Sequence, residues 1–221
     1  MASNPPDRHY QRALEFIASA DWCAAEGCLL RARAARASGG VLDLELTDAL
    51  AYVLLMQGEF QAVLTVLTPV LDAPGRSFWI HHKQADAFRG LHQAAAAVRH
   101  YRQALIDGSD SPLTSRNLLQ VLHGEDPALA LAELERWLPL PGPRLEGARE
   151  AAMLVAGLEL AHWLQARGLA NPALQRRLAE QQLYHLQPVQ KGWFTTSGGD
   201  GDAAWLAGLQ RRLQGLGLLE G

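Results

Sequence analysis

The residues best suited to acid–base or metal chemistry lie in one predicted helix, where His81 and His82 are followed by Asp86. His82 and Asp86 are one helical turn apart, so they share a face and can pair. Two such side chains do not make a metal site, and no third ligand is indicated nearby. A solvated or hydrogen-bonded pair is therefore the favoured interpretation, and catalysis in a pocket at His82 and Asp86 is the alternative.

A second candidate lies in a glycine-rich stretch, where Asp200 and Asp202 alternate with glycine as calcium ligands can. An EF-hand loop needs an acidic ligand at its twelfth position, and the twelfth residue counted from Asp200 is Arg211. The calcium interpretation fails, and Asp202 is better explained as the N-cap of a helix. We predict no metal and no cofactor.

The usual signatures of enzymes do not occur in the sequence. It has no Walker-type or GxGxxG glycine loop, no GxSxG elbow and no HExxH helix. Cys23 and Cys28 lack a CxxC spacing and a cationic neighbourhood, so we expect free thiols that serve as buried small hydrophobic side chains. We predict that the chain is not an enzyme. Chemistry at His82 with Asp86, or near Trp193, is the alternative.

Composition and charge restrict the partners. The chain has 221 residues, of which 48% are hydrophobic, enough for a folded core. With 20 Lys and Arg against 23 Asp and Glu, the formal net charge is -3, so no global attraction to phosphate backbones exists. We predict no nucleic-acid partner. RNA binding by helical repeats is an alternative that the acidic balance disfavours.

The sequence predicts a cytoplasmic protein without a membrane segment. Its first residues do not resemble a signal peptide, and no apolar run approaches the roughly 20 residues of a membrane span. Heavy use of Ala, Leu, Arg and Gly with few Lys suggests a GC-rich bacterial source.

Helix is predicted almost throughout, because Ala, Leu, Gln, Glu and Arg fill long segments with apolar residues three and four apart. Two helix starts are well specified, since Ser111-Pro112 and Asn171-Pro172 each place a capping residue before a proline. The breakers that divide the helices are Gly39-Gly40, Gly58, Pro74-Gly75, Gly108, Gly124, the run from Pro139 to Pro143, Gly168, and the stretch from Gln187 to Gly201.

Self-comparison reveals a repeat across the first two-thirds of the chain. One set of apolar residues is Ala51, Leu54, Val63, Leu67, Val70 and Leu71. It reappears about 34 residues later as Ala85, Phe88, Ala97, Tyr101, Ala104 and Leu105. An earlier copy, separated by a slightly longer step, is Ala13, Phe16, Ala25, Leu29 and Ala32, with Arg33 breaking the correspondence. The Gly39-Gly40 linker can hold the extra residues of that step.

A fourth unit of the repeat begins near Pro112. It keeps the same step at Leu119 and Leu122, and its second helix follows one position early, at Ala130, Leu134 and Trp137. The turn between its two helices, from Gly124 to Pro127, is therefore predicted to be shorter.

This pattern resembles the tetratricopeptide repeat over about residues 6–140. The resemblance implies a right-handed superhelical solenoid of about four antiparallel helix pairs. Small residues such as Ala51 and Ala85 let helices approach closely, and bulky ones fill the gap to the next repeat. Val63 and Val70 depart from the family pattern, and Pro69 falls inside a predicted helix, which it should kink or shorten. A helical solenoid of different geometry stays open.

Beyond Pro143 the period disappears, and we predict a separate helical cap. Two domains follow, a repeat domain at 1–140 and a capping region at 141–221, with helices at about 144–167, 172–186 and 202–216. The end of a solenoid exposes an apolar face that such helices can cover. Trp193 and Phe194 adjoin a glycine-rich loop, which is either an anchored crossing over the cap or a second contact site.

The resemblance implies that the first helices of successive repeats line a concave groove for a peptide or a partner's helix. Helical periodicity assigns outward positions on these helices: Tyr10, Gln11, Leu14, Ile17, Asp48, Tyr52, Leu55, Met56, Trp79, His82, Lys83, Asp86, Arg89, Arg116, Asn117 and Gln120. The early positions are apolar and aromatic. The late ones include Lys83, Arg89 and Arg116, which suit a carboxylate or acidic side chains.

The sequence therefore predicts an all-α interaction scaffold or adaptor that binds a protein or peptide without turnover. The predicted contact residues are Tyr52, Trp79, His82, Lys83, Asp86, Arg89, Arg116, Asn117 and Gln120, with Trp193 and Phe194 as a possible second contact site. Charges that merely keep a helical face solvated are the competing interpretation. An accessory module that recruits substrate for a separately encoded enzyme, such as a transferase, is the alternative function.

Overall fold

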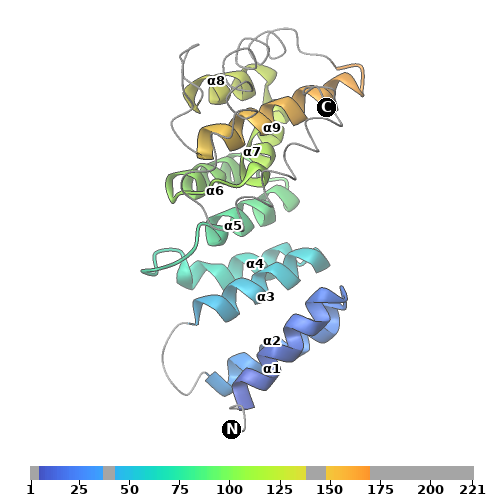
Figure 1. Cartoon of the computed structure of the whole chain (residues 1–221), viewed down its shortest axis with the longest axis vertical. Helices are drawn as coiled ribbons and strands as arrows, with labels where there is room; N and C mark the ends of the chain where they lie inside the picture. The colour runs from blue at the N-terminus through green and yellow to red at the C-terminus, as the bar shows by residue number, and fades with distance from the viewer. Residues whose placement is uncertain (1–4, 37–42, 138–147, 170–221) are drawn as a thin grey trace, which may run out of the picture. The chain divides into compact units, whose positions relative to one another are not determined.

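The computed structural model describes residues 5–36, 43–137 and 148–169 (Figure 1). These residues form α-helices joined by short turns and contain no strand, so the all-α prediction is confirmed. No helix among them is both long and apolar enough to cross a membrane. The helices are α1 (Pro5–Ala18), α2 (Trp22–Arg36), α3 (Leu44–Gln57), α4 (Phe60–Leu67), the 3-10 turn η2 (Thr68–Val70), α5 (Trp79–Gly90), α6 (Ala94–Ile106), α7 (Pro112–Glu125), α8 (Pro127–Trp137) and α9 (Ala148–Gln165).

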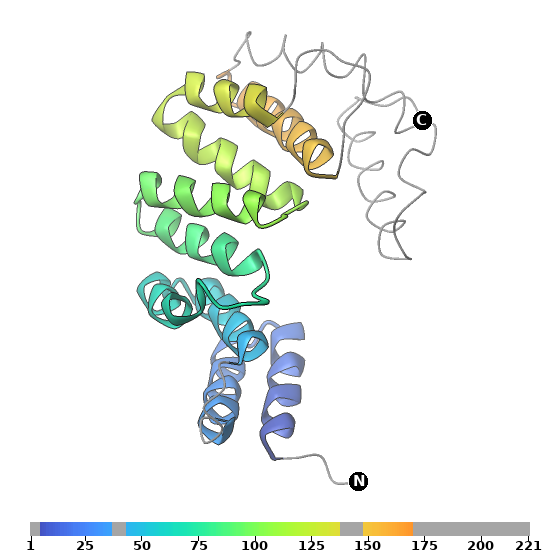
Figure 2. The same ribbon diagram turned by 90° about the vertical axis from the view of Figure 1, so that its left-hand side faces the viewer.

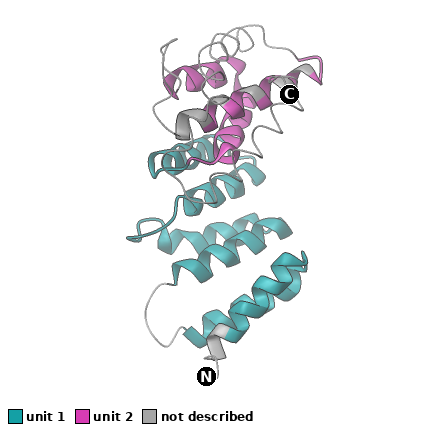
Figure 3. Cartoon of the chain, viewed as in Figure 1, with its two compact units in different colours: residues 1–109 teal, residues 110–221 magenta. Residues whose placement is uncertain are grey.

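The chain divides into two compact units, residues 1–109 and 110–221 (Figure 3). Unit 1 holds α1 to α6, and the described part of unit 2 holds α7 to α9. The boundary predicted at residues 140 and 141 falls between 138 and 147, outside the described residues.

Within each unit, consecutive helices pack as antiparallel neighbours (Figures 1 and 2). In unit 1 the pairs are α1 with α2, α3 with α4, and α5 with α6, and each pair also contacts the next. The first helices of two pairs, α3 and α5, contact each other directly. In unit 2, α9 contacts α7 more extensively than it contacts α8. In unit 1 the order is reversed, since α5 contacts α4 more extensively than it contacts α3.

The ends of α3 show how local sequence sets the helix boundaries. Asp43 precedes the helix in an extended conformation, and its Oδ1 accepts a hydrogen bond of 3.0 Å from the backbone N–H of Leu46. This satisfies one of the unpaired donors of the first turn. Gly58 ends the helix with φ at +78°, a left-handed conformation that glycine adopts without steric cost.

The left-handed turn recurs at the equivalent place in each helix pair of unit 1. Ala20 and His92 both have φ of +58°, and they occupy the positions that correspond to Gly58 in the pairs before and after it. Two non-glycine residues accept this unusual conformation because the turn between antiparallel helices requires it. In unit 2 the turn is shorter, as predicted, since α7 ends at Glu125 and α8 begins at Pro127.

Pro69 shortens the second helix of its pair. α4 ends at Leu67, and the chain continues as the 3-10 turn from Thr68 to Val70. Proline cannot donate a backbone hydrogen bond and its ring clashes with the preceding turn, so the α-helical ladder stops there. The prediction that Pro69 kinks or shortens this helix is confirmed.

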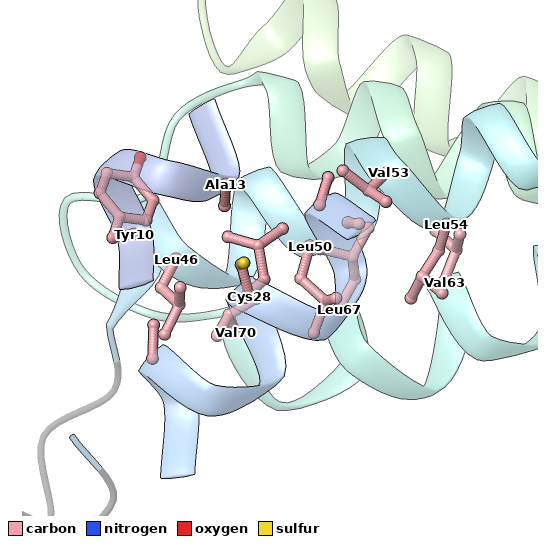
Figure 4. Packing of buried hydrophobic residues seen from close by; sticks show 14 of the residues in the cluster. Tyr10, Ala13, Cys28, Leu46, Leu50, Val53, Leu54, Val63, Leu67 and Val70 are labelled. Carbon is pink, nitrogen blue, oxygen red and sulfur yellow. The ribbon is translucent and has the colours of Figure 1, made fainter. Parts of the chain in front are cut away.

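Buried apolar residues of α1 to α5 form a core cluster in unit 1 (Figure 4), and four of the repeating positions are buried in every helix pair of the unit. The small residues of the first helices and three positions of each second helix have no exposed surface at all. These are Ala13, Ala51 and Ala85, then Ala25, Val63 and Ala97, then Leu29, Leu67 and Tyr101, then Ala32, Val70 and Ala104. Equivalent residues at these four positions therefore have equal burial, which confirms their predicted packing role. At the other two positions burial differs: Leu54 is buried but Phe16 and Phe88 are half-buried, and Leu105 is buried but Leu71 is half-buried.

The core of unit 2 follows the same positions. Leu119 and Leu122 are buried on α7, and Ala130 and Leu134 on α8. The helix predicted at about 144–167 is α9, Ala148–Gln165. Its buried residues include Ala152, Met153, Val155, Ala156, Leu160 and Leu164. The helices predicted at 172–186 and 202–216, together with Asp202, lie outside the described residues.

The two cysteines differ from each other in their surroundings. Both are free thiols, and Cys28 is buried in the core between helices as predicted. Cys23 is exposed, so the prediction of a buried side chain is wrong for it. It occupies the first turn of α2, and its spacing from Cys28 points the two side chains to different sides of that helix.

Candidate functional site

The most unusual feature of the described chain is a run of buried polar residues on α5. His81, His82, Lys83 and Gln84 are all buried, between the apolar Ile80 and Ala85. Polar side chains in a protein interior are normally hydrogen-bonded or ion-paired, because an unpaired one costs free energy. The partners of His81, His82 and Lys83 come from α3, from α6, from the segment before α5 and from Asp86 of α5 itself, whereas Oε1 of Gln84 is buried with no hydrogen-bond partner.

Lys83 is neutralised by a residue of the preceding helix pair. Its Nζ donates a hydrogen bond to Oδ1 of Asp48 on α3 and lies 5.8 Å from the centre of the Trp79 ring. Burial lowers the pKa of the Lys83 ammonium, and the Asp48 carboxylate opposes that shift. The ammonium is thus enclosed between a carboxylate and an indole ring and is not presented to solvent.

Asp86 gathers three further side chains into what we name the Asp86 cluster. The Tyr101 hydroxyl of α6 donates to Oδ1, His82 Nε2 lies 3.2 Å from Oδ2, and Arg89 Nη2 lies 3.3 Å from Oδ1. Burial alone would raise the pKa of Asp86, but the hydrogen bond and charge of His82, with Tyr101 and Arg89, hold it below the usual value. The carboxylate therefore stays ionised and satisfied.

Aromatic rings enclose His82 within this cluster. The Trp79 ring meets it edge-on with centroids 4.9 Å apart, and the Tyr101 ring does so at 5.8 Å. As a result His82 is only 3% exposed. The predicted pairing of His82 with Asp86 is confirmed, yet a general base must reach its substrate within hydrogen-bonding distance, and these rings cover the imidazole.

A second polar group lies on the neighbouring face of α5, which we name the histidine pair. His81 Nδ1 and His100 Nδ1 are 3.0 Å apart, joining α5 to α6. Arg76 Nη2 lies 3.4 Å from His81 Nε2 and donates to Asp107 Oδ2 at 2.8 Å. The Phe88 ring stacks on His100 with centroids 5.2 Å apart.

The predicted contact residues differ widely in exposure. Tyr52 and Arg89 are exposed, and Trp79, Asp86, Arg116 and Gln120 are half-buried. His82, Lys83 and Asn117 are buried, so the assignment of outward positions is wrong for these three, as it is for Tyr10. His82 and Lys83 are covered by Trp79, Tyr101 and Asp48, and Asn117 lies on α7, which packs against both α8 and α9. Trp193 and Phe194 fall outside the described residues.

The cations predicted to bind a carboxylate each lie beside a carboxylate of the chain itself. Lys83 pairs with Asp48, Arg89 with Asp86, and Arg116 Nη1 lies 3.6 Å from Glu159 Oε2. Arg116, Asn117 and Gln120 also belong to unit 2, whereas the other six predicted residues belong to unit 1. The Lys83 ammonium, in particular, forms a buried ion pair with Asp48.

The predicted apolar part of the surface is exposed only in part, because Ile17 and Leu55 are half-buried against the core. Leu14 on α1 and Tyr52 and Met56 on α3 are 39%, 38% and 48% exposed. Tyr52 is oriented by Trp22, whose ring meets it edge-on with centroids 5.9 Å apart. Tyr10, by contrast, turns inward and donates from its hydroxyl to Glu45 Oε1 at 3.0 Å.

Sequence reasoning missed the bonds that reach between helices. The sequence places Asp48 on the surface and Tyr101 in the core. It does not predict that Asp48 bonds to Lys83 or that Tyr101 bonds to Asp86. Asp48 and Lys83 are 35 residues apart, close to the repeat period. A search for opposite charges one period apart would have found this pair.

No set of three or more His, Cys, Asp or Glu side chains is placed to hold a metal ion in the described ranges. Comparison with family models, with curated proteins and with solved structures finds no match for this chain.

Proposed function

We propose that this chain is an interaction scaffold that binds a peptide segment or a partner protein along the first helices of its helix pairs. The observation that carries the proposal is the exposure of Leu14, Tyr52 and Met56, all on first helices. Large apolar and aromatic side chains on a solvent-facing surface are common anchors of protein interfaces. No cofactor and no turnover are part of this function.

The proposal includes the tetratricopeptide-like arrangement of helix pairs in a solenoid of about four repeats. Three observations support it. The equivalent small and large residues one repeat period apart are completely buried. The turns at Ala20, Gly58 and His92 share a left-handed conformation. The first helices α3 and α5 contact each other, as do α7 and α9.

The partner we propose contributes apolar side chains first and an acidic group second. Tyr52 and Met56 offer apolar contact area, and among the predicted cations of unit 1 Arg89 has the most exposed side chain, at 41%. Lys83 does not serve this role in the proposal, because its ammonium is buried against Asp48. An acidic side chain or free carboxylate would meet Arg89.

A comparison of two variants in partner capture tests the proposal. Tyr52→Ala with Met56→Ala removes the exposed apolar groups of α3. Leu30→Ala is the matched control, since Leu30 is 45% exposed but lies on a second helix, α2. Because all these side chains are exposed, we expect each variant to melt within a few degrees of the native chain.

We expect mass spectrometry of captured proteins to find a partner held by the native chain and the Leu30 control but lost with the α3 variant. Arg89→Ala alone should weaken capture, without abolishing it, if the partner carries a carboxylate. Equal capture by all variants would place binding elsewhere on the chain and reject the proposed surface.

A further inference from the structure

The histidine pair has a geometry that allows one proton between its two rings. The ring centroids are 5.3 Å apart, the planes are inclined by 29°, and the two Nδ1 atoms are 3.0 Å apart. The distance between the ring centroids exceeds the distance between the Nδ1 atoms by about two ring radii. Both Nδ1 atoms therefore lie between the two ring centres and point at each other. One nitrogen must donate its N–H and the other must accept with its lone pair.

The neighbouring arginine favours His81 as the donor ring. A guanidinium has only donors, and Arg76 Nη2 lies 3.4 Å from Nε2 of His81. In this contact Nε2 of His81 accepts, so we assign the hydrogen of the neutral ring to its Nδ1. His81 Nδ1–H then donates to Nδ1 of His100, and His100 carries its hydrogen on Nε2.

In this arrangement neither ring can gain a proton without cost. A proton added to His100 must go to Nδ1, where it would face the N–H of His81 and break the bond between the rings. A proton added to His81 must go to Nε2, where it would face the Arg76 guanidinium, with Asp107 Oδ2 at 3.8 Å. Once α6 separates from α5, both rings can be protonated in water.

The charged groups around the pair favour its neutral form on balance. Burial lowers the pKa of His81, Arg76 lowers it further, and Asp107 and Asp72 oppose the shift. Burial also lowers the pKa of His100 to about 4, with contributions from His81 and Arg99. These groups come from the segment before α5, from α6 and from its C-terminal end; Phe88 of α5 covers the ring of His100.

The pair is placed to control the Asp86 cluster, because His100 and Tyr101 are adjacent on α6. His100 bonds to His81, and the Tyr101 hydroxyl bonds to Asp86. Both contacts join the same two helices. We propose that the His81–His100 pair is an acid-sensitive latch, which holds α6 on α5 while it is neutral and releases α6, together with the Tyr101 contact to Asp86, when it is protonated.

The direction of the pH dependence follows from linkage. Both histidines have a lowered pKa when α6 is packed, so the open form binds more protons than the closed form below about pH 6.5. The stabilisation from the neutral pair is fully present above that pH and is lost as the pH falls toward the lowered pKa of His100. We expect the opening equilibrium of α6 to rise roughly tenfold from about pH 7 to about pH 5.

Hydrogen–deuterium exchange of the full chain tests the latch. Exchange of peptides from α6 would be compared with that of peptides from α2 at both pH values, after correction for intrinsic exchange rates. In the native chain, the protection factors of α6 amides should fall at the lower pH by a factor roughly ten times larger than those of α2 amides.

The test variant is His100→Asn, because the Asn Oδ1 lies near the position of Nδ1 and accepts from His81 but takes no proton. We expect α6 of this variant to lose clearly less protection at the lower pH than α6 of the native chain, because only His81 can still take up a proton. The matched control is His92→Asn, which removes an exposed histidine in the turn between the same helices and should retain the native pH response. A native pH response in His100→Asn would overturn the proposal.

Imidazole nitrogen NMR of the native chain gives an independent answer even if a variant folds poorly. At about pH 7 the spectra should show His81 protonated on Nδ1 and His100 protonated on Nε2. The opposite tautomers, or a positive charge on both rings in the packed state, would contradict the latch.

Discussion

At the scale of single residues, the buried charges of α5 are matched by residues from other helices. Asp48 of α3 meets Lys83, and Tyr101 of α6 meets Asp86. Removing one partner of such a pair strands a buried charge, which is costly, although the intact pair contributes little net stability. These contacts therefore fix the relative positions of the helices more than they strengthen the core.

Close packing at Gly90 predicts the effect of a single substitution on stability. A Cβ built on Gly90, at the end of α5, would lie 2.4 Å from Cζ of Phe60 at the start of α4. In an ordinary helix, replacing glycine by alanine stabilises by about 0.5–1 kcal/mol. We expect Gly90→Ala to destabilise unit 1 by about 1–3 kcal/mol instead, because the Phe60 ring must be displaced.

Thermal or urea unfolding measures this effect, and Gly27→Ala is the matched control. Gly27 lies inside α2, and its Cβ would meet nothing closer than 3.9 Å, at Nη2 of Arg31. The control should gain the ordinary helix-propensity benefit. If both variants were stabilised alike, the close approach of Phe60 to Gly90 would not exist in solution.

At the scale of helices, the sequence predicted burial correctly at positions where the repeat period alone determines which residues lie between helices. The repeat period identified the completely buried positions, such as Ala51 and Ala85, because only small residues fit where helices approach closely. The prediction that Pro69 would kink or shorten its helix was correct, since its effect on the backbone is local.

The same reasoning failed where burial depends on a residue from another helix. Periodicity placed His82 and Lys83 outward on α5, but it contains no information about Trp79 folding over them or Asp48 reaching across from α3. Likewise, it could not show that His100 meets His81, because that contact depends on how α6 is rotated against α5. Side-chain pairing between helices is thus the part of the site that the sequence could not supply.

The confirmed packing positions lead to a prediction about α5. Ala85 has no exposed surface, so Ala85→Leu must push helices apart, and overpacking of this kind costs about 1–3 kcal/mol. Ala95→Leu on the exposed face of α6 makes the same chemical change and should stay within about 0.5 kcal/mol of the native chain. Urea unfolding of both variants checks this, and equal stabilities would mean that Ala85 does not sit at a helix crossing.

At the scale of the whole molecule, the division into two units changes which truncations should be tolerated. Unit 1 ends at Ser109 and has a hydrophobic core of its own, built from α1 to α5. In unit 2, α7 is packed against α9, whose Met153, Leu160 and Leu164 have no exposed surface. A chain cut after Pro143 keeps α7 and α8 but lacks α9, and it leaves the apolar face of α7 uncovered.

We therefore expect two truncations to behave in opposite ways. The fragment 1–109 should be monodisperse and melt cooperatively, because no element of its core is removed. The longer fragment 1–143 should aggregate or melt without a second cooperative unit, since the large exposed apolar face of α7 promotes association. Circular dichroism melts and size-exclusion chromatography of both fragments decide the matter. A soluble 1–143 fragment that melts cooperatively through both units would show that residues 144–221 are not needed to cover the helix pairs.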